Sequence, residues 1–82
     1  MARKNFYYTV IFEPAEEGGY VVHVPALPGL VTEGDTLQEA RAMAEDAILG
    51  YLEVLIEDGK PIPEDVASQP QIERLEVGLE LS

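Results

Sequence analysis

The stretch from Gly19 to Ile48 most constrains what this chain can fold into, because strand, turn and helix signals follow one another there without a gap. Residues 20–24 are rich in β-branched and aromatic side chains, which favours a strand. Residues 30–33 predict a second short strand. Between them lies a stiff corner, since proline fixes its own φ and restricts the residue before it. The corner consists of Pro25, Ala26, Leu27, Pro28 and Gly29.

An earlier strand is predicted over residues 5–13. Aromatic and apolar side chains recur there at every second position, which is the period of a pleated strand. They are Phe6, Tyr8, Val10 and Phe12. Pro14 ends this strand, and the segment that leads through Gly19 to Tyr20 has the glycines of a tight turn. Residues 5–13 and 20–24 are therefore expected to pair as an antiparallel hairpin.

A helix is predicted over residues 36–58, after a turn at Gly34 and Asp35. Thr36 is a good N-cap, and Glu39 three residues later completes a capping box. Asp35 also places negative charge at the positive end of the helix dipole. Apolar side chains at helical spacing form a core stripe. This stripe contains Leu37, Ala40, Ala44, Ala47, Ile48, Tyr51, Leu52 and Leu55.

After a proline-containing linker, residues 74–81 predict a last strand. Leu75, Val77, Leu79 and Leu81 alternate there with residues that are mostly charged. The predicted order is therefore β-β-β-α-β. This is an α+β fold in which a small, antiparallel-rich sheet packs on one long helix, and residues 1–82 form a single domain.

Two further surfaces of the helix are candidates for contact with partners. Glu39, Asp46 and Glu53 recur every seven residues and form an acidic back that could face a partner; the edges of the sheet are the alternative surface. Other apolar side chains lie outside the core stripe, which favours a homo-oligomer contact. These are Met43, Leu49, Val54 and Ile56. Alternatively, the long helix overhangs the sheet and their exposure is incidental.

Charge and size limit the classes of function. A net charge of −11, from 16 acidic and 5 basic side chains, repels phosphate backbones and attracts basic partners. The alternative is that this charge only maintains solubility. A chain of 82 residues buries a thin core, and no cysteine is present to supplement it, so oligomerisation is expected. No signal peptide or membrane span is predicted, and we expect a cytoplasmic protein.

Catalytic patterns are weak. His23 is the only histidine, and without a cysteine or a second histidine it is expected to be structural. Glu33, Asp35 and the three acidic side chains of the helix back could in principle form a two-metal site. Capping and a solvated helix face explain them better. We therefore predict no enzyme activity, cofactor or metal.

Several short motifs together resemble HicB-type antitoxin domains, over residues 7–63. They comprise Gly19-Tyr20, Pro25-Ala26-Leu27-Pro28-Gly29, Thr32-Glu33-Gly34-Asp35-Thr36, Glu39-Ala40, Ala44, Ala47, Ile48 and residues 57–63. The resemblance implies a partial RNase H-like fold, in which these residues set the corner and cap the helix. It also implies a partner, a small basic HicA-type ribonuclease toxin that the domain silences.

Two departures from this family are visible. Many members continue into a helix-turn-helix or ribbon-helix-helix segment, whereas this sequence is expected to lack such a DNA-binding module. Leu30 stands where many relatives have cysteine after Pro-Gly. The resemblance leaves two hypotheses open: an antitoxin that neutralises a HicA-type toxin, or an orphan homo-oligomeric adaptor of the same fold without a toxin. A third, an RNase H-like nuclease with a simplified site, ranks behind both.

Overall fold

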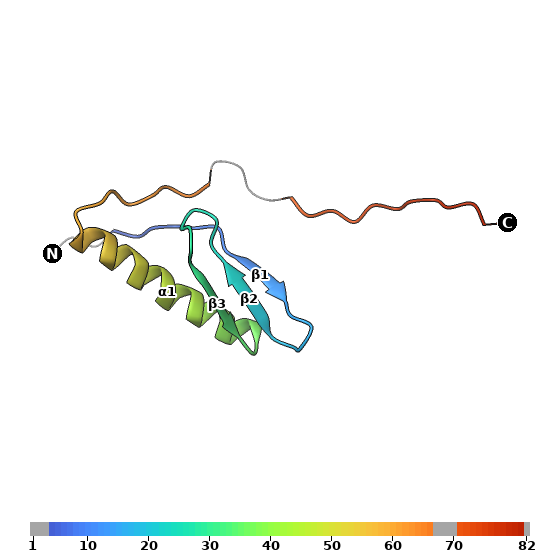
Figure 1. The fold of residues 1–82 in the computed structure, drawn as a ribbon, viewed down its shortest axis with the longest axis horizontal. Helices are drawn as coiled ribbons and strands as arrows, with labels where there is room; N and C mark the ends of the chain where they lie inside the picture. Colours follow the sequence, from blue (N-terminus) through green and yellow to red (C-terminus); the bar gives the residue numbers. More distant parts are fainter. Residues whose placement is uncertain (1–3, 67–70, 82) are drawn as a thin grey trace.

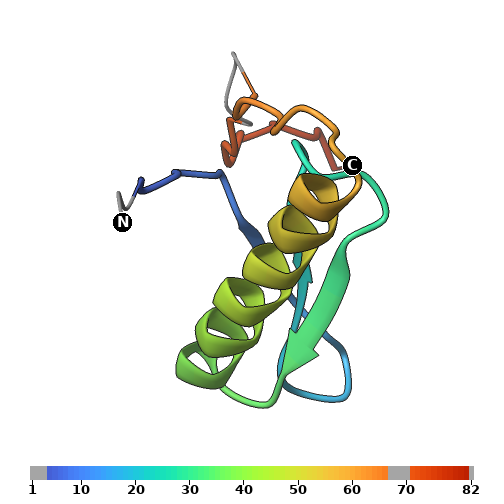
Figure 2. The same cartoon turned by 90° about the vertical axis from the view of Figure 1, so that its left-hand side faces the viewer.

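The computed structural model describes residues 4–66 and 71–81, and it has a three-stranded antiparallel sheet and one long helix. The elements are β1 (Ile11–Pro14), β2 (Tyr20–His23), β3 (Val31–Gly34) and α1 (Leu37–Glu57). The strand order is β1-β2-β3, and α1 lies across one face of the sheet (Figure 1). The predicted α+β class, a small sheet packed on one long helix, is therefore confirmed. The helix packs mainly over β3 and less over β2, as Figure 2 shows from the helix side.

Strand β1 is shorter than predicted, because its ladder begins at Ile11 and not at Asn5. The register pairs Ile11 with His23 and Phe12 with Val22. Two residues beyond His23 comes Pro25, which has no amide hydrogen and opens the corner. Strand β2 therefore ends before it can pair with residues 5–10, and these residues continue past the sheet without a ladder.

The junction between β3 and α1 depends on two glycines. A Cβ on Gly34 would lie 2.5 Å from the Ala40 amide nitrogen, so β3 ends in direct backbone contact with the first helical turn. Gly19, at φ +77, lies against the other side of this junction, where a Cβ would approach the Gly34 carbonyl oxygen to 2.6 Å. Only residues without a side chain allow three backbone segments to meet this closely.

The ends of α1 follow the local sequence signals. Thr36 is the N-cap, and its hydroxyl accepts a hydrogen bond from the Glu39 amide at 3.0 Å. At the other end, Gly59 takes φ +67, and the Lys60 amide donates to the Leu55 carbonyl. These bonds satisfy backbone groups that a helix terminus otherwise leaves open.

The corner after β2 supplies much of the core. Two successive turns close through bonds from the Leu27 amide to the Val24 carbonyl and from the Leu30 amide to the Leu27 carbonyl. They direct Leu27 inward, where it is fully buried. One cluster of buried side chains contains Val24, Leu27, Leu30 and Leu52, and the other contains Val22, Ala40 and Ala44. Seven hydrophobic residues are thus buried among those described, which is a small core.

The strand predicted over residues 74–81 does not pair with the sheet. Residues 71–81, which we call the C-terminal arm, run extended and exposed, and no described residue forms a ladder with them. The arm leads away from the helix and sheet (Figure 1). The radius of gyration is accordingly 17.1 Å, against about 12 Å for a compact chain of this length. The alternation predicts a strand from local propensity, but a strand also needs a neighbouring edge.

Candidate protein-binding site

The acidic back of α1 is exposed to solvent. Glu39, Asp46 and Glu53, which we call the acidic ridge, are all solvent-accessible on the outer side of the helix. A seven-residue step on a helix advances about 10.5 Å, so the three carboxylates form a line parallel to the axis. Among the described residues there is no group of three or more acidic or histidine side chains placed to hold a metal ion. The ridge is therefore a charged surface suited to long-range attraction.

The four apolar side chains that the sequence predicts to contact another copy are also exposed. Met43, Leu49, Val54 and Ile56 have exposed fractions of 43%, 57%, 54% and 63%. Helical spacing divides them into two stripes: Met43 and Val54 are eleven residues apart, and Leu49 and Ile56 are seven apart. They flank the core stripe on opposite sides and do not form a single patch. Whether they contact another copy stays a prediction.

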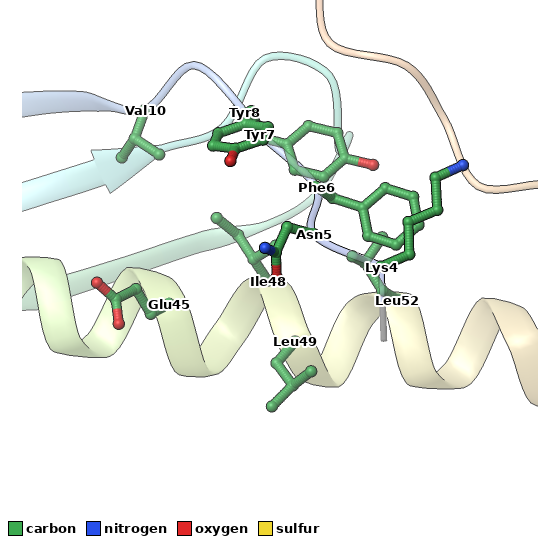
Figure 3. A pocket seen from close by; sticks show the side chains of 10 residues that line it. All are labelled: Lys4, Asn5, Phe6, Tyr7, Tyr8, Val10, Glu45, Ile48, Leu49 and Leu52. Carbon is green, nitrogen blue, oxygen red and sulfur yellow. The ribbon is translucent and has the colours of Figure 1, made fainter. Parts of the chain in front are cut away.

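A groove of about 670 Å³ runs between the N-terminal segment and α1. Lys4, Asn5, Phe6, Tyr7, Tyr8 and Val10 line one side, and Glu45, Ile48, Leu49 and Leu52 line the other (Figure 3). A smaller hollow of about 210 Å³ extends it toward Phe12 and Arg41. The groove exists because α1 covers β3 and β2, which leaves the β1 side of the sheet open.

A polar clamp fixes the linker after α1 against the segment that precedes β1. Asp65 accepts hydrogen bonds from the Thr9 amide at 2.9 Å and from the Thr9 hydroxyl at 2.7 Å. The amide bond, followed by the hydroxyl bond, lowers the pKa of the Asp65 carboxyl below its usual value. Beside it the Tyr8 hydroxyl donates to the Pro63 carbonyl, and burial, with Asp65 nearby, raises the pKa of Tyr8. The linker therefore closes over the N-terminal segment.

The histidine lies on a strand beside a carboxylate. His23 lies on β2 with Nε2 3.3 Å from Glu13 Oε2, across the β1–β2 ladder. Both side chains are substantially exposed, so the pair contributes little to stability. Ser68 lies outside the described residues, and the sequence has no cysteine.

The predicted motif residues lie mainly at the turns, and Tyr20, Gly34 and Asp35 among them line a small hollow at the β3 end. Gly19, Gly34 and Ala40 approach one another at the β3–α1 junction, and Thr36 caps the helix. The corner that contains Pro25, Leu27, Pro28 and Gly29 is held to the helix by the Tyr51 hydroxyl, which donates to the Pro28 carbonyl at 3.1 Å. Tyr20 packs against the Val22 cluster, and Asp35 is exposed next to the N-cap.

Sequence reasoning missed the groove and the Asp65 clamp. Both join segments that are far apart in the chain: Thr9 and Asp65 are separated by 56 positions. The alternation of Phe6, Tyr8 and Val10 indicated an apolar face, but not that the helix would leave this face open. A short polar linker such as the one that contains Asp65 carries no periodic signal.

The chain is a small, acidic α+β domain with an exposed acidic ridge and an open apolar groove. No helix in the described part of the chain is long and apolar enough to cross a membrane. Comparison with known families identifies the class: residues 8–77 match the model of the HicB-like antitoxins of bacterial toxin–antitoxin systems. The chain belongs to this family.

Individual relatives agree with this assignment. The chain is 48% identical over 60 residues to Antitoxin HicB 1 of Photorhabdus laumondii and 41% identical over 56 residues to Antitoxin HicB of Escherichia coli K12. These matches cover 73% and 68% of this chain but only 39% and 41% of the two relatives. A UPF0150 protein of Thermoplasma acidophilum is 47% identical over 62 residues, which cover 76% of this chain and 90% of that protein. The chain thus spans about two-fifths of the HicB antitoxins that it matches.

Proposed function

We propose that this protein is an antitoxin that binds a small basic HicA-type ribonuclease and blocks RNA cleavage, without catalysis of its own, in the cytoplasm. What supports the proposal is membership of the antitoxin family together with the acidic ridge on α1. A net charge of −11 attracts a basic toxin and repels the RNA for which the toxin competes. The docked antitoxin then covers the RNA-binding face of the toxin.

In this proposal the acidic ridge gives direction to the encounter. Its side chains lie on one side of a rigid 21-residue helix, so their fields add over the same approach path. Charges of this kind raise the association rate and depend on ionic strength, whereas apolar contacts set the lifetime of the complex. Raising the salt concentration should therefore slow association more than it speeds dissociation.

The test is to measure binding to a purified HicA-type toxin, taken from a small basic reading frame beside this gene if one is present. Asp46→Lys with Glu53→Lys reverses two charges of the ridge and should slow association about tenfold or more at low salt. The matched control, Glu16→Lys with Glu17→Lys, makes the same charge change in the exposed β1–β2 turn. If both double variants slow association equally, net charge alone explains the effect, and the ridge is rejected as the docking surface.

The alternative function is an orphan homo-oligomeric adaptor of the same fold. The exposed apolar side chains on both flanks of α1 favour it. It predicts that no small basic reading frame lies beside the gene, and that the purified protein forms one defined oligomer and leaves a HicA-type ribonuclease fully active.

A further inference from the structure

We propose that the C-terminal arm of one copy adds as a strand to the open β1 edge of a second copy and fills the groove between its N-terminal segment and α1. The inference concerns self-association and does not depend on the toxin. Three features of the described residues carry it: an arm without a ladder, an edge without a neighbouring strand, and a match between the two in length and charge.

The arm has the pattern of a strand that is buried on one side. Its apolar side chains, at positions 72, 75, 77, 79 and 81, are 77–89% exposed in the single chain. Four of them share one face of an extended chain: Leu75, Val77, Leu79 and Leu81. A row this apolar is costly to leave in water, since burying each leucine or valine is worth about 1.5–3 kcal/mol.

The β1 edge is the receptor. Among the described strands β1 pairs only with β2, so its other side presents amides and carbonyls that are a template for a further strand. The face toward α1 carries the row Phe6, Tyr8, Val10 and Phe12, and these four residues line the groove and its smaller extension. This row and the arm row each span six residue steps, about 20 Å in an extended chain.

Charge distinguishes this edge from the β3 edge. Two of the five basic side chains of this acidic protein, Lys4 and Arg41, line the groove and its extension, together with one acidic side chain, Glu45. The arm carries Glu73, Glu76 and Glu80 against the single Arg74. At the β3 end, by contrast, Glu17, Glu33 and Asp35 line the neighbouring hollow and would repel the arm.

A second copy of the chain can supply an edge for the arm and an arm for the edge at the same time. The linker is fixed to Thr9 through Asp65, and beyond it the arm points away from the body of its own chain (Figure 1). In a two-fold dimer each arm would occupy the groove of the other copy, so both edges and both apolar rows are buried at once. The small core of the single chain is thereby enlarged.

The first test compares two neighbouring arm positions by sedimentation velocity over a concentration series. Leu79→Glu places a charge in the apolar row, whereas Gly78→Glu places the same side chain on the opposite face. We expect a wild-type dimer, at least about tenfold weaker dimerisation for Leu79→Glu, and little change for Gly78→Glu. Because the arm makes no ladder in the single chain, circular dichroism should show intact α1 in both variants. A monomeric wild type, or equal effects of the two variants, would overturn the proposal.

The second test locates the arm by disulfide trapping, which is specific because the chain has no cysteine. One preparation carries Tyr7→Cys, at the groove, and the other carries Leu79→Cys, in the arm; the two are mixed and oxidised. Predominant disulfides between a groove-substituted chain and an arm-substituted chain support the proposal. Predominant pairing between two arms would overturn it. So would efficient closure within a chain that carries both substitutions, because the arm would then occupy its own groove.

Discussion

Replacing Gly34 by alanine should destabilise the fold, although alanine adds only one methyl group. The added Cβ would lie 2.5 Å from the amide nitrogen and 2.7 Å from the Cα of Ala40. Ordinary contact begins near 3.4 Å, so β3 and the first turn of α1 must separate by roughly an ångström. Both groups are backbone, and neither can rotate away.

The size of the effect follows from two opposing terms. Forcing an extra methyl group into a packed site costs about 1–3 kcal/mol. Alanine also reduces the freedom of the unfolded chain, which returns about 0.4–1 kcal/mol. We expect a net loss of about 1–2 kcal/mol from a total of about 4–12 kcal/mol for a domain of this size. This loss corresponds to a fall in Tm of about 4–8 °C per kcal/mol.

Urea denaturation at one protein concentration measures this difference. The matched control is Gly50→Ala, because Gly50 is exposed within α1 and its added Cβ meets nothing within 4 Å. This control should gain about 0.5–1 kcal/mol, since glycine is a poor helix former. The two identical substitutions are therefore predicted to have opposite signs. A Gly34→Ala variant as stable as the wild type would refute the close β3–α1 contact.

Three further predictions concern the core, the linker clamp and the corner. Leu27→Ala removes a fully buried side chain and should lower the free energy of unfolding by about 2–5 kcal/mol. Val54→Ala, on the exposed helix surface, should change it by less than about 0.5 kcal/mol. Similar values for the two variants in urea denaturation would contradict the assignment of Leu27 to the core. Because the folded-state pKa of Asp65 is lowered, its stabilisation is complete above its unfolded pKa and is lost as the pH falls through the folded value. Stability of the wild type should therefore drop more steeply below about pH 4 than that of Asp65→Asn, and parallel pH profiles would argue against the clamp. Tyr51→Phe removes the hydrogen bond from the Tyr51 hydroxyl to the Pro28 carbonyl and should lower the free energy of unfolding by about 0.5–1.5 kcal/mol. Amide hydrogen exchange in the corner should become faster. Unchanged exchange would show that this bond does not hold the corner.

Local signals in the sequence explain how well the helix could be predicted. Thr36 and Gly59 cap the two ends of α1, and each contacts residues within about one helical turn of its own position in the sequence. The hairpin is similarly local, because β1 and β2 are joined by a short turn. The α+β order of three strands and a helix therefore followed from short-range patterns.

The rest depends on contacts between distant segments. The ladder of β1 starts at Ile11 because β2 ends before Pro25, and nothing within residues 5–10 reveals this limit. Likewise, the alternation in residues 74–81 indicates strand propensity but not which edge would receive the strand. The acidic ridge was evident from its seven-residue spacing, whereas the groove required knowing which strands α1 covers.

The central claim, that the protein neutralises a ribonuclease toxin, is tested most directly by RNA cleavage. A HicA-type toxin is purified, from a small basic reading frame beside this gene if one is present, and its cleavage of RNA is followed as this protein is added in increasing ratio. We predict that cleavage falls in proportion to the added protein and stops when a stoichiometric complex is reached. Cleavage that continues at the uninhibited rate in about tenfold excess of a folded protein would contradict the claim.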